Sequence, residues 1–250
     1  CLPKERHGYD PTLSYGTNEG AHDGNTLFEN YIADINGIWK NMIVIAAGNE
    51  GESRHHVRTI VKSAENSRTE FAIGENERDM RLFIWKYFQD EFEIFLNTPS
   101  GKRINILESV SINSERENID SVMVMPTPYN GKQLIEVQFR AGKNLNYVLP
   151  GIWGIEFEVS GKIKCGVVDM WLPTIEAIGL STGFLRPSSD TTATIPATAF
   201  KVLSVGAYNQ TTESVAAFSG RGFTADGRLV PLVVAAGVDV LAAGYGGEYV

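Results

Sequence analysis

Asn49 is the residue whose type and position most clearly suggest chemistry. It follows the run from Ile43 to Gly48, in which apolar residues typical of a buried parallel strand give way to small ones. In open α/β sheets, ligands bind beyond the carboxyl ends of the strands, so a side-chain amide at this place would meet a ligand. The alternative is a turn asparagine that tolerates left-handed backbone geometry beside glycine. Taken alone, the local pattern leaves both interpretations open.

The four histidines show no comparable pattern. His7 lies in a polar, turn-rich stretch, and His22 lies in the sequence GAHDG. His55 and His56 are adjacent, a spacing that does not place two ligands on one helix face for a metal ion. We therefore assign no catalytic role to any histidine and expect no metal site.

Composition excludes several classes of protein. The chain has 250 residues, of which 43% are hydrophobic, enough for one large domain or two smaller ones. Its net charge of -8, with no cluster of Lys and Arg, argues against nucleic-acid binding. No apolar run reaches the roughly 18 residues of a membrane span. We expect a folded protein with neither nucleic acid nor a membrane span among its partners.

A strand, a helix and a second strand are predicted to position Asn49. The sequence TLSYG over residues 12–16 predicts a short strand, and residues 42–47 predict a buried one. Between them, Thr26 and Glu29 form a capping box that predicts a helix over residues 26–40. Its predicted apolar face consists of Leu27, Phe28, Tyr31, Ile32, Ile35, Ile38 and Trp39. These elements together predict one right-handed βαβ unit.

From about residue 68 to 173 the pattern changes to short β-rich runs separated by turns. Phe92, Ile94 and Leu96 alternate with polar residues, which is typical of a half-buried antiparallel strand. Many such runs predict a sandwich or jelly roll. The aromatic residues in them could form a sugar-binding platform, but core packing is the favoured interpretation; they include Trp85, Tyr87, Phe88, Trp153 and Trp171.

The α/β pattern returns near residue 191, with a buried strand predicted over 201–207 and a further apolar run from residue 232 onward. The sequence therefore predicts an α/β fold, a parallel sheet with helices that is interrupted by an inserted antiparallel β jelly-roll or sandwich domain. The predicted boundaries are 1–54 for the first part of the core, 55–185 for the insertion and 186–250 for the second part of the core.

Four segments, in order, resemble the subtilisin-like serine proteases (subtilases, peptidase family S8). They are AAGNEG, TIPATAFKVLSVGAYN, FSGRG and AAGVDVLAAGYGG. The segment LSYGTNEGAHDG and the large β insertion after Asn49 are similar to the clostridial germination-specific subtilases, which carry a jelly roll at this place. The resemblance implies that the parallel sheet is part of a subtilisin-like core.

The resemblance also implies roles for individual residues. Asn49 would donate a hydrogen bond from its side-chain amide to the oxyanion of an acyl-transfer intermediate, forming part of an oxyanion hole. The implied substrate-binding residues are Ser14, Tyr15 and Gly16 on an edge strand, and Ala46, Ala47 and Gly48 on the facing wall of a pocket. An edge strand binds an extended peptide through main-chain hydrogen bonds. Small residues in a wall leave room for a substrate side chain, although they also permit close packing of a neighbouring element.

The family's three catalytic patterns are absent: Asp-x-Gly, His-Gly-Thr-His and Gly-Thr-Ser. By motif order the first two would lie upstream of residue 1 and the third beyond Val250. Leu232 and Ala236 stand where the family has an acidic residue and a proline. We interpret the chain as an internal fragment of a serine endopeptidase, inactive in isolation. The first alternative is an inactive pseudoprotease that binds or scaffolds, and the second is a carbohydrate-binding module.

The resemblance implies a protein or peptide substrate, and a secreted location or one in a bacterial spore or cell envelope. No cofactor is expected. Calcium binding, the oligomeric state, the physiological substrate and the residue preferred at the cut are left open.

Overall fold

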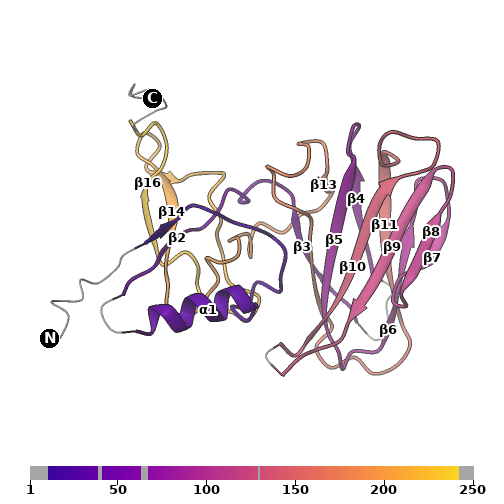
Figure 1. Cartoon of the computed structure of the whole chain (residues 1–250), viewed down its shortest axis with the longest axis horizontal. Helices are drawn as coiled ribbons and strands as arrows, with labels where there is room; N and C mark the ends of the chain where they lie inside the picture. The colour runs from indigo at the N-terminus through magenta and orange to yellow at the C-terminus, as the bar shows by residue number, and fades with distance from the viewer. Residues whose placement is uncertain (1–10, 39–40, 63–66, 129, 242–250) are drawn as a thin grey trace, which may run out of the picture.

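The computed structural model describes residues 11–38, 41–62, 67–128 and 130–241. His7, Trp39 and the end of the last resemblance segment lie outside these residues. Two regions are visible in Figure 1: a small sheet with one helix, and a larger block of long strands. Within the described ranges, no helix combines the length and the apolar character needed to cross a membrane.

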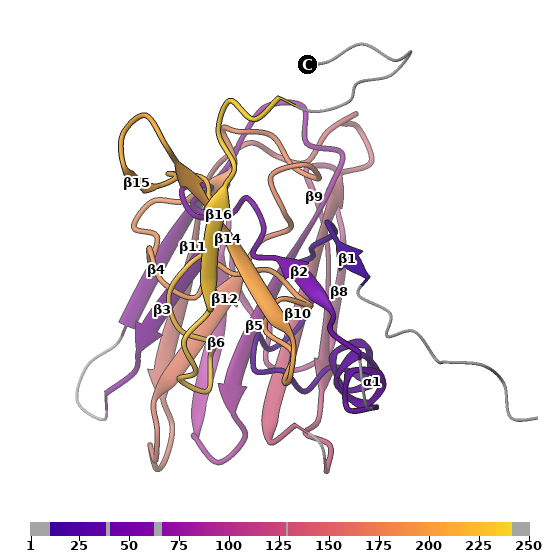
Figure 2. The same cartoon turned by 90° about the vertical axis from the view of Figure 1, so that its left-hand side faces the viewer.

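The small sheet is built mainly from parallel strands far apart in the sequence. Its members are β1 (Thr12–Leu13), β2 (Val44–Ala46), β14 (Leu203–Asn209), β15 (Ser214–Val215) and β16 (Val233–Ala236). β2 pairs in parallel with β1 on one side and β14 on the other, and β16 pairs in parallel with β14. β15 is antiparallel to β14. Figure 2 shows β16, β14, β2 and β1 side by side in this order.

Helix α1 (Leu27–Asn36) lies below the strands of this sheet in the view of Figure 1. The predicted capping box is confirmed: Thr26 and Glu29 each bond to the other's backbone N–H. The helix ends at Asn36, four residues before the predicted end, because Gly37 caps it. Its buried contacts come from a small apolar cluster of Ile32, Ile43, Ile45, Ala197, Ala199 and Val202. The predicted apolar face is only partly buried, and Leu27, Phe28, Tyr31 and Ile38 are exposed.

The larger block consists of two antiparallel sheets that share one core. The first has the order β3-β12-β5-β10-β9-β8, with bounds β3 (His56–Ile60), β5 (Asp79–Tyr87), β8 (Val110–Asn113), β9 (Glu117–Val124), β10 (Lys132–Ala141) and β12 (Val167–Trp171). The second has the order β13-β4-β11-β6-β7, with bounds β4 (Ser67–Ile73), β6 (Phe92–Asn97), β7 (Arg103–Asn105), β11 (Gly151–Val159) and β13 (Gly183–Phe184). The longest pairing runs from Lys132 opposite Tyr87 to Arg140 opposite Asp79.

Alternating side chains from both sheets form the core of the block. Phe92, Ile94 and Leu96 are buried, which confirms the period-two pattern read for that strand. They join one continuous cluster with side chains of the other sheet, such as Ile84 and Val137. The favoured interpretation of the aromatic residues holds for Trp153 and Trp171, which are fully buried, whereas Tyr87 and Phe88 are exposed. The jelly-roll topology and the domain boundaries 1–54, 55–185 and 186–250 stay predictions.

The prediction of an α/β fold is wrong for the chain. Most strands are antiparallel, and α1 is the only helix among the described residues. The prediction assumed helices in the connections between the parallel strands, because such strands need a long connection that is usually helical. Only β1 and β2 are joined through a helix; the connection from β2 to β14 contains the antiparallel block itself. The apolar run from residue 232 forms only the short strand β16, which is exposed along its whole length.

Candidate active site

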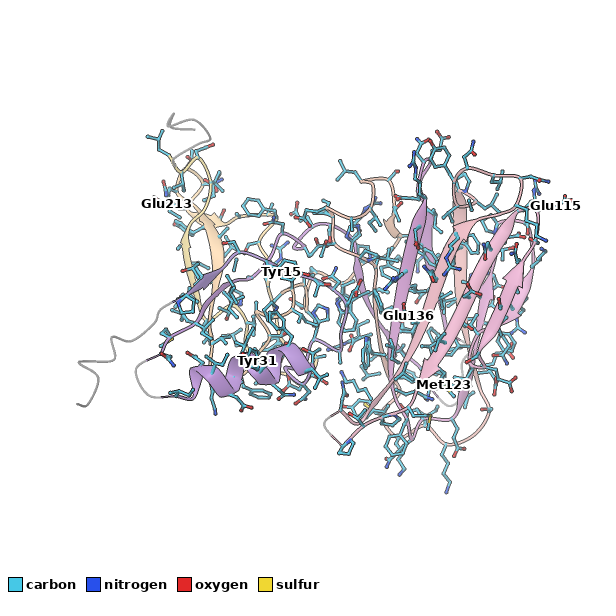
Figure 3. All side chains as sticks on the ribbon, viewed as in Figure 1. Tyr15, Tyr31, Glu115, Met123, Glu136 and Glu213 are labelled. Carbon is cyan, nitrogen blue, oxygen red and sulfur yellow. The ribbon has the colours of Figure 1, made fainter. Side chains whose placement is uncertain are left out.

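Two neighbouring strand ends form the base of a cleft. β1 and β2 run parallel, with Leu13 opposite Ile45, so the segments that follow them leave the sheet at the same edge. These segments line a cleft of about 510 Å³. Its lining residues are Ser14, Tyr15, Gly16, Thr17, Ala46, Gly48, Asn49, Glu50, Thr174, Glu176 and Thr194. Figure 3 shows Tyr15 between the small sheet and the antiparallel block, where segments of both regions can contribute to the cleft.

Thr194 joins the two strand ends. Its backbone N–H donates to the carbonyl oxygen of Ala47 at 2.9 Å, and the neighbouring Ile195 exchanges two backbone hydrogen bonds with Thr17. Its side chain packs against Gly16 and Gly48, where an added Cβ atom would lie 2.3 and 2.4 Å from the Thr194 hydroxyl oxygen. Glycine is therefore required at both positions for this close packing.

Gly48 also turns the chain so that Asn49 leaves the strand. Its φ is +90°, a conformation that favours glycine. The next side chain, Asn49, is exposed and lines the cleft. Its Nδ2 donates to Glu176 Oε1 at 3.3 Å. A primary amide has two N–H donors, so this side chain can donate a further hydrogen bond to a bound carbonyl oxygen.

Ser14, Tyr15 and Gly16 continue β1 without forming part of the sheet ladder. Ser14 and Tyr15 are exposed, with Tyr15 at 64%. An exposed backbone of this kind beside a cleft can accept an extended peptide by adding a strand. The predicted strand over residues 12–16 is therefore shorter in the structure, and its last three residues lie along the cleft.

A buried carboxylate supports the Asn49 turn. Glu50 Oε2 lies 2.9 Å from His55 Nδ1, and Glu50 Oε1 accepts from the Ile175 N–H at 2.9 Å. Burial by itself would raise the pKa of Glu50, but hydrogen bonds from His55, Ser53 and the Ile175 N–H hold it below its ordinary value. The ionised carboxylate thus fastens the segment that carries Glu176 to the turn that carries Asn49.

The other two described histidines contact the junction between the small sheet and the block. His22 and His56 both stack on Trp171, with ring centroids 4.3 and 4.7 Å from it. Burial lowers the pKa of His22 to about 4. Asp169 accepts from His56 and from Arg58, and these bonds outweigh burial and hold the pKa of Asp169 far below its ordinary value.

No described histidine belongs to a catalytic triad. The ring nitrogens of His22 and His56 face carbonyl or carboxylate oxygens, and Nε2 of the buried His55 has no partner. A serine protease base must contact the nucleophilic hydroxyl. Over the same residues, no cluster of three or more His, Cys, Asp or Glu side chains is arranged to hold a metal ion.

Six of the seven residues assigned from the sequence line this cleft: Ser14, Tyr15, Gly16, Ala46, Gly48 and Asn49. Ala47 does not line it, since its side chain is 2% exposed and follows Ile45 onto the buried face. The period of two along β2 could have indicated this. Thr174, Glu176 and Thr194 were missed. Thr194 begins one of the resemblance segments, whereas nothing in the sequence around Glu176 signals its position.

No protein-family model matches this chain, and no curated protein matches it. A solved structure of the CspB protease of Clostridium perfringens is similar, with a TM-score of 0.84 and 30% sequence identity. The match covers 95% of this chain and 50% of that one, so the chain spans half the length of the protease. The chain is thus similar, over nearly all its residues, to part of a clostridial protease.

Proposed function

We propose that the chain is an internal portion of a subtilisin-type serine endopeptidase and contains its oxyanion-hole asparagine and substrate cleft. The proposal rests on one observation: at one edge of the small sheet, the exposed amide of Asn49 and the segment Ser14 to Gly16, which lies outside the sheet ladder, line the same cleft. The similarity to a clostridial protease supports it.

In this proposal the substrate lies extended along Ser14 to Gly16 and adds a strand through main-chain hydrogen bonds. The side chain before the cut enters the pocket between that segment and the wall at Ala46 and Gly48. The scissile carbonyl then lies near Asn49, whose amide donates most strongly once the oxygen is negatively charged. A donor that is already oriented costs no reorganisation during the reaction, which is why it accelerates acyl transfer.

The nucleophile, its general base and the orienting carboxylate are proposed to lie outside this chain, in the half of the protease that it does not match. The isolated chain is therefore expected to have no peptidase activity, because oxyanion stabilisation cannot replace a nucleophile and base. Hydrolysis of a peptide ester that persists through repurification would contradict this expectation. No cofactor is proposed; the proposed location is secreted, or in a spore or cell envelope.

A pseudoprotease is the second candidate function. Leu232 and Ala236 replace residues typical of the subtilases, and β16, on which Ala236 lies, is exposed. In such a protein the same cleft would bind peptides without cleaving them.

The sequence on either side of this chain in its gene, with the chemistry of the longer protein, separates the two candidates. Intact Asp-x-Gly, His-Gly-Thr-His and Gly-Thr-Ser patterns, and covalent labelling of that serine by a fluorophosphonate, support the endopeptidase. A substitution at any of the three catalytic positions, with no labelling, would overturn it in favour of the pseudoprotease.

A further inference from the structure

The cleft contains two carboxylates and, among its lining residues, no cationic side chain. The two carboxylates differ in their surroundings. Glu50 is buried and bonded to His55 and to the Ile175 N–H. Glu176 is exposed, and no described Lys, Arg or His forms an ion pair with it; its contact is Asn49. Among the described residues, the negative charge of Glu176 in the cleft therefore has no cationic partner.

The segment around Glu176 is held in place from both sides. The Ile175 N–H donates to Glu50, and the Ala177 N–H donates to the Thr174 carbonyl at 2.8 Å, which closes a turn around Glu176. Ile178 is buried in the core of the antiparallel block. Glu176 thus extends from a fixed turn toward the Asn49 amide.

This placement conflicts with catalysis unless the charge is balanced. An oxyanion formed at Asn49 would lie within a few ångströms of the Glu176 carboxylate, and like charges at that distance repel. The carboxylate also occupies one of the two N–H donors of the Asn49 amide, so that only the other remains for the oxyanion. A cation in the cleft would remove both problems, because it would pair with Glu176 and release the amide.

We propose that Glu176 is a specificity-determining residue that selects substrates with a lysine or arginine side chain in the cleft beside Asn49. This inference rests on the proposed function, since it assumes that peptides bind in this cleft. The cationic side chain of the substrate supplies the counter-charge that the described lining residues lack. When the substrate side chain is neutral and of the same size, the Glu176 carboxylate keeps its hydrogen bond to the Asn49 amide.

The test uses the 250-residue chain and pairs of blocked peptides that differ only in arginine or its neutral isostere citrulline, placed at each position in turn. Calorimetry measures the dissociation constants for the unaltered chain, for Glu176→Gln and for a control, Glu213→Gln. The control removes the same charge from an exposed position near β15, on the far side of the small sheet in Figure 3.

For one of the tested peptide positions, the unaltered chain should bind the arginine peptide about three- to tenfold more tightly than the citrulline peptide. Added salt should weaken this preference. In Glu176→Gln, the ratio of the two dissociation constants should be close to one, whereas in Glu213→Gln it should be the same as in the unaltered chain. Equal binding of both peptides, or a preference that persists in Glu176→Gln, would overturn the inference while leaving the cleft as a peptide site. If no peptide binds, the proposed function fails and the inference fails with it.

Discussion

Gly48 determines where the Asn49 side chain is placed. Its φ of +90° turns the chain at the end of β2, and the Thr194 side chain fills the space where a Cβ atom would lie. A substitution here therefore meets two separate obstacles, the backbone conformation and the contact with Thr194. The Asn49 amide depends on both for its orientation.

Gly48→Ala is expected to lower the free energy of unfolding by more than the roughly 1 kcal/mol to 3 kcal/mol typical of a strained backbone alone. The measurement is urea denaturation, with Gly101→Ala as the matched control. Gly101 has a φ of +87°, but no atom lies within 4 Å of its added Cβ. Equal losses in the two variants would show that contact with Thr194 contributes nothing.

At the scale of elements, the junction between the small sheet and the antiparallel block contains a titratable group. His22 comes from the loop before α1 and stacks on Trp171 at the end of β12. Its folded-state pKa of about 4 lies below the unfolded value of 6.5. The unfolded chain therefore binds this proton more tightly, and stability is lost as the pH falls from about 6.5 to about 4.

We expect this loss to reach about 3 kcal/mol, since each pKa unit corresponds to about 1.4 kcal/mol. The lowered pKa of Asp169 adds a further loss as the pH falls below about 4. The variant His22→Asn should flatten the dependence between pH 6.5 and 4; asparagine tolerates the φ of 51° at this position. Denaturation across that range measures the slope. The same slope in variant and unaltered chain would exclude His22 as the cause.

Local signals in the sequence were sufficient for some elements. The capping box of Thr26 and Glu29 placed the start of α1, and the period of two identified the buried face of β6. The burial of Glu29 could not be predicted, because it depends on Thr198, which donates to its carboxylate from a segment remote in sequence. The exposure of Leu27 and Tyr31 could not be predicted either. The helical period identifies the apolar face of a helix, but it does not show which part of that face packs against another element.

The candidate site was predictable where its residues lie in motifs and unpredictable where they do not. The segment from Ser14 to Gly16 directly follows β1, and Asn49 lies shortly after the end of β2. Glu176 enters the cleft from a turn 127 positions away from Asn49, after most of the antiparallel block. Only the folded connection brings this carboxylate to the amide, so the charge of the cleft could not be inferred from local pattern.

At the scale of the whole molecule, the antiparallel block has its own core. Its apolar cluster runs from Val57 to Phe184 and includes side chains of both sheets. Residues 55–185 expressed alone are therefore expected to fold as an antiparallel β unit, because a segment of this length can bury a sufficient core. Circular dichroism and amide hydrogen exchange test this. A helix-rich or unfolded spectrum would count against the predicted boundaries.

We propose that Asn49 stabilises the oxyanion in the longer protein proposed to contain this chain. Steady-state kinetics of Asn49→Ala in that protein test it most directly. Turnover should fall about 10²- to 10³-fold, the loss typical when one oxyanion-hole donor is removed, while the Michaelis constant stays nearly unchanged. Asn49→Asp should be at least as slow, since its carboxylate offers no donor and repels the oxyanion.

Both variants should keep the stability of the unaltered protein, because the Asn49 side chain is exposed and lies outside the apolar clusters. Equal denaturation midpoints therefore serve as the control for folding. The defect of both variants should be confined to turnover. Unaltered turnover, or a defect that lies wholly in the Michaelis constant, would contradict it.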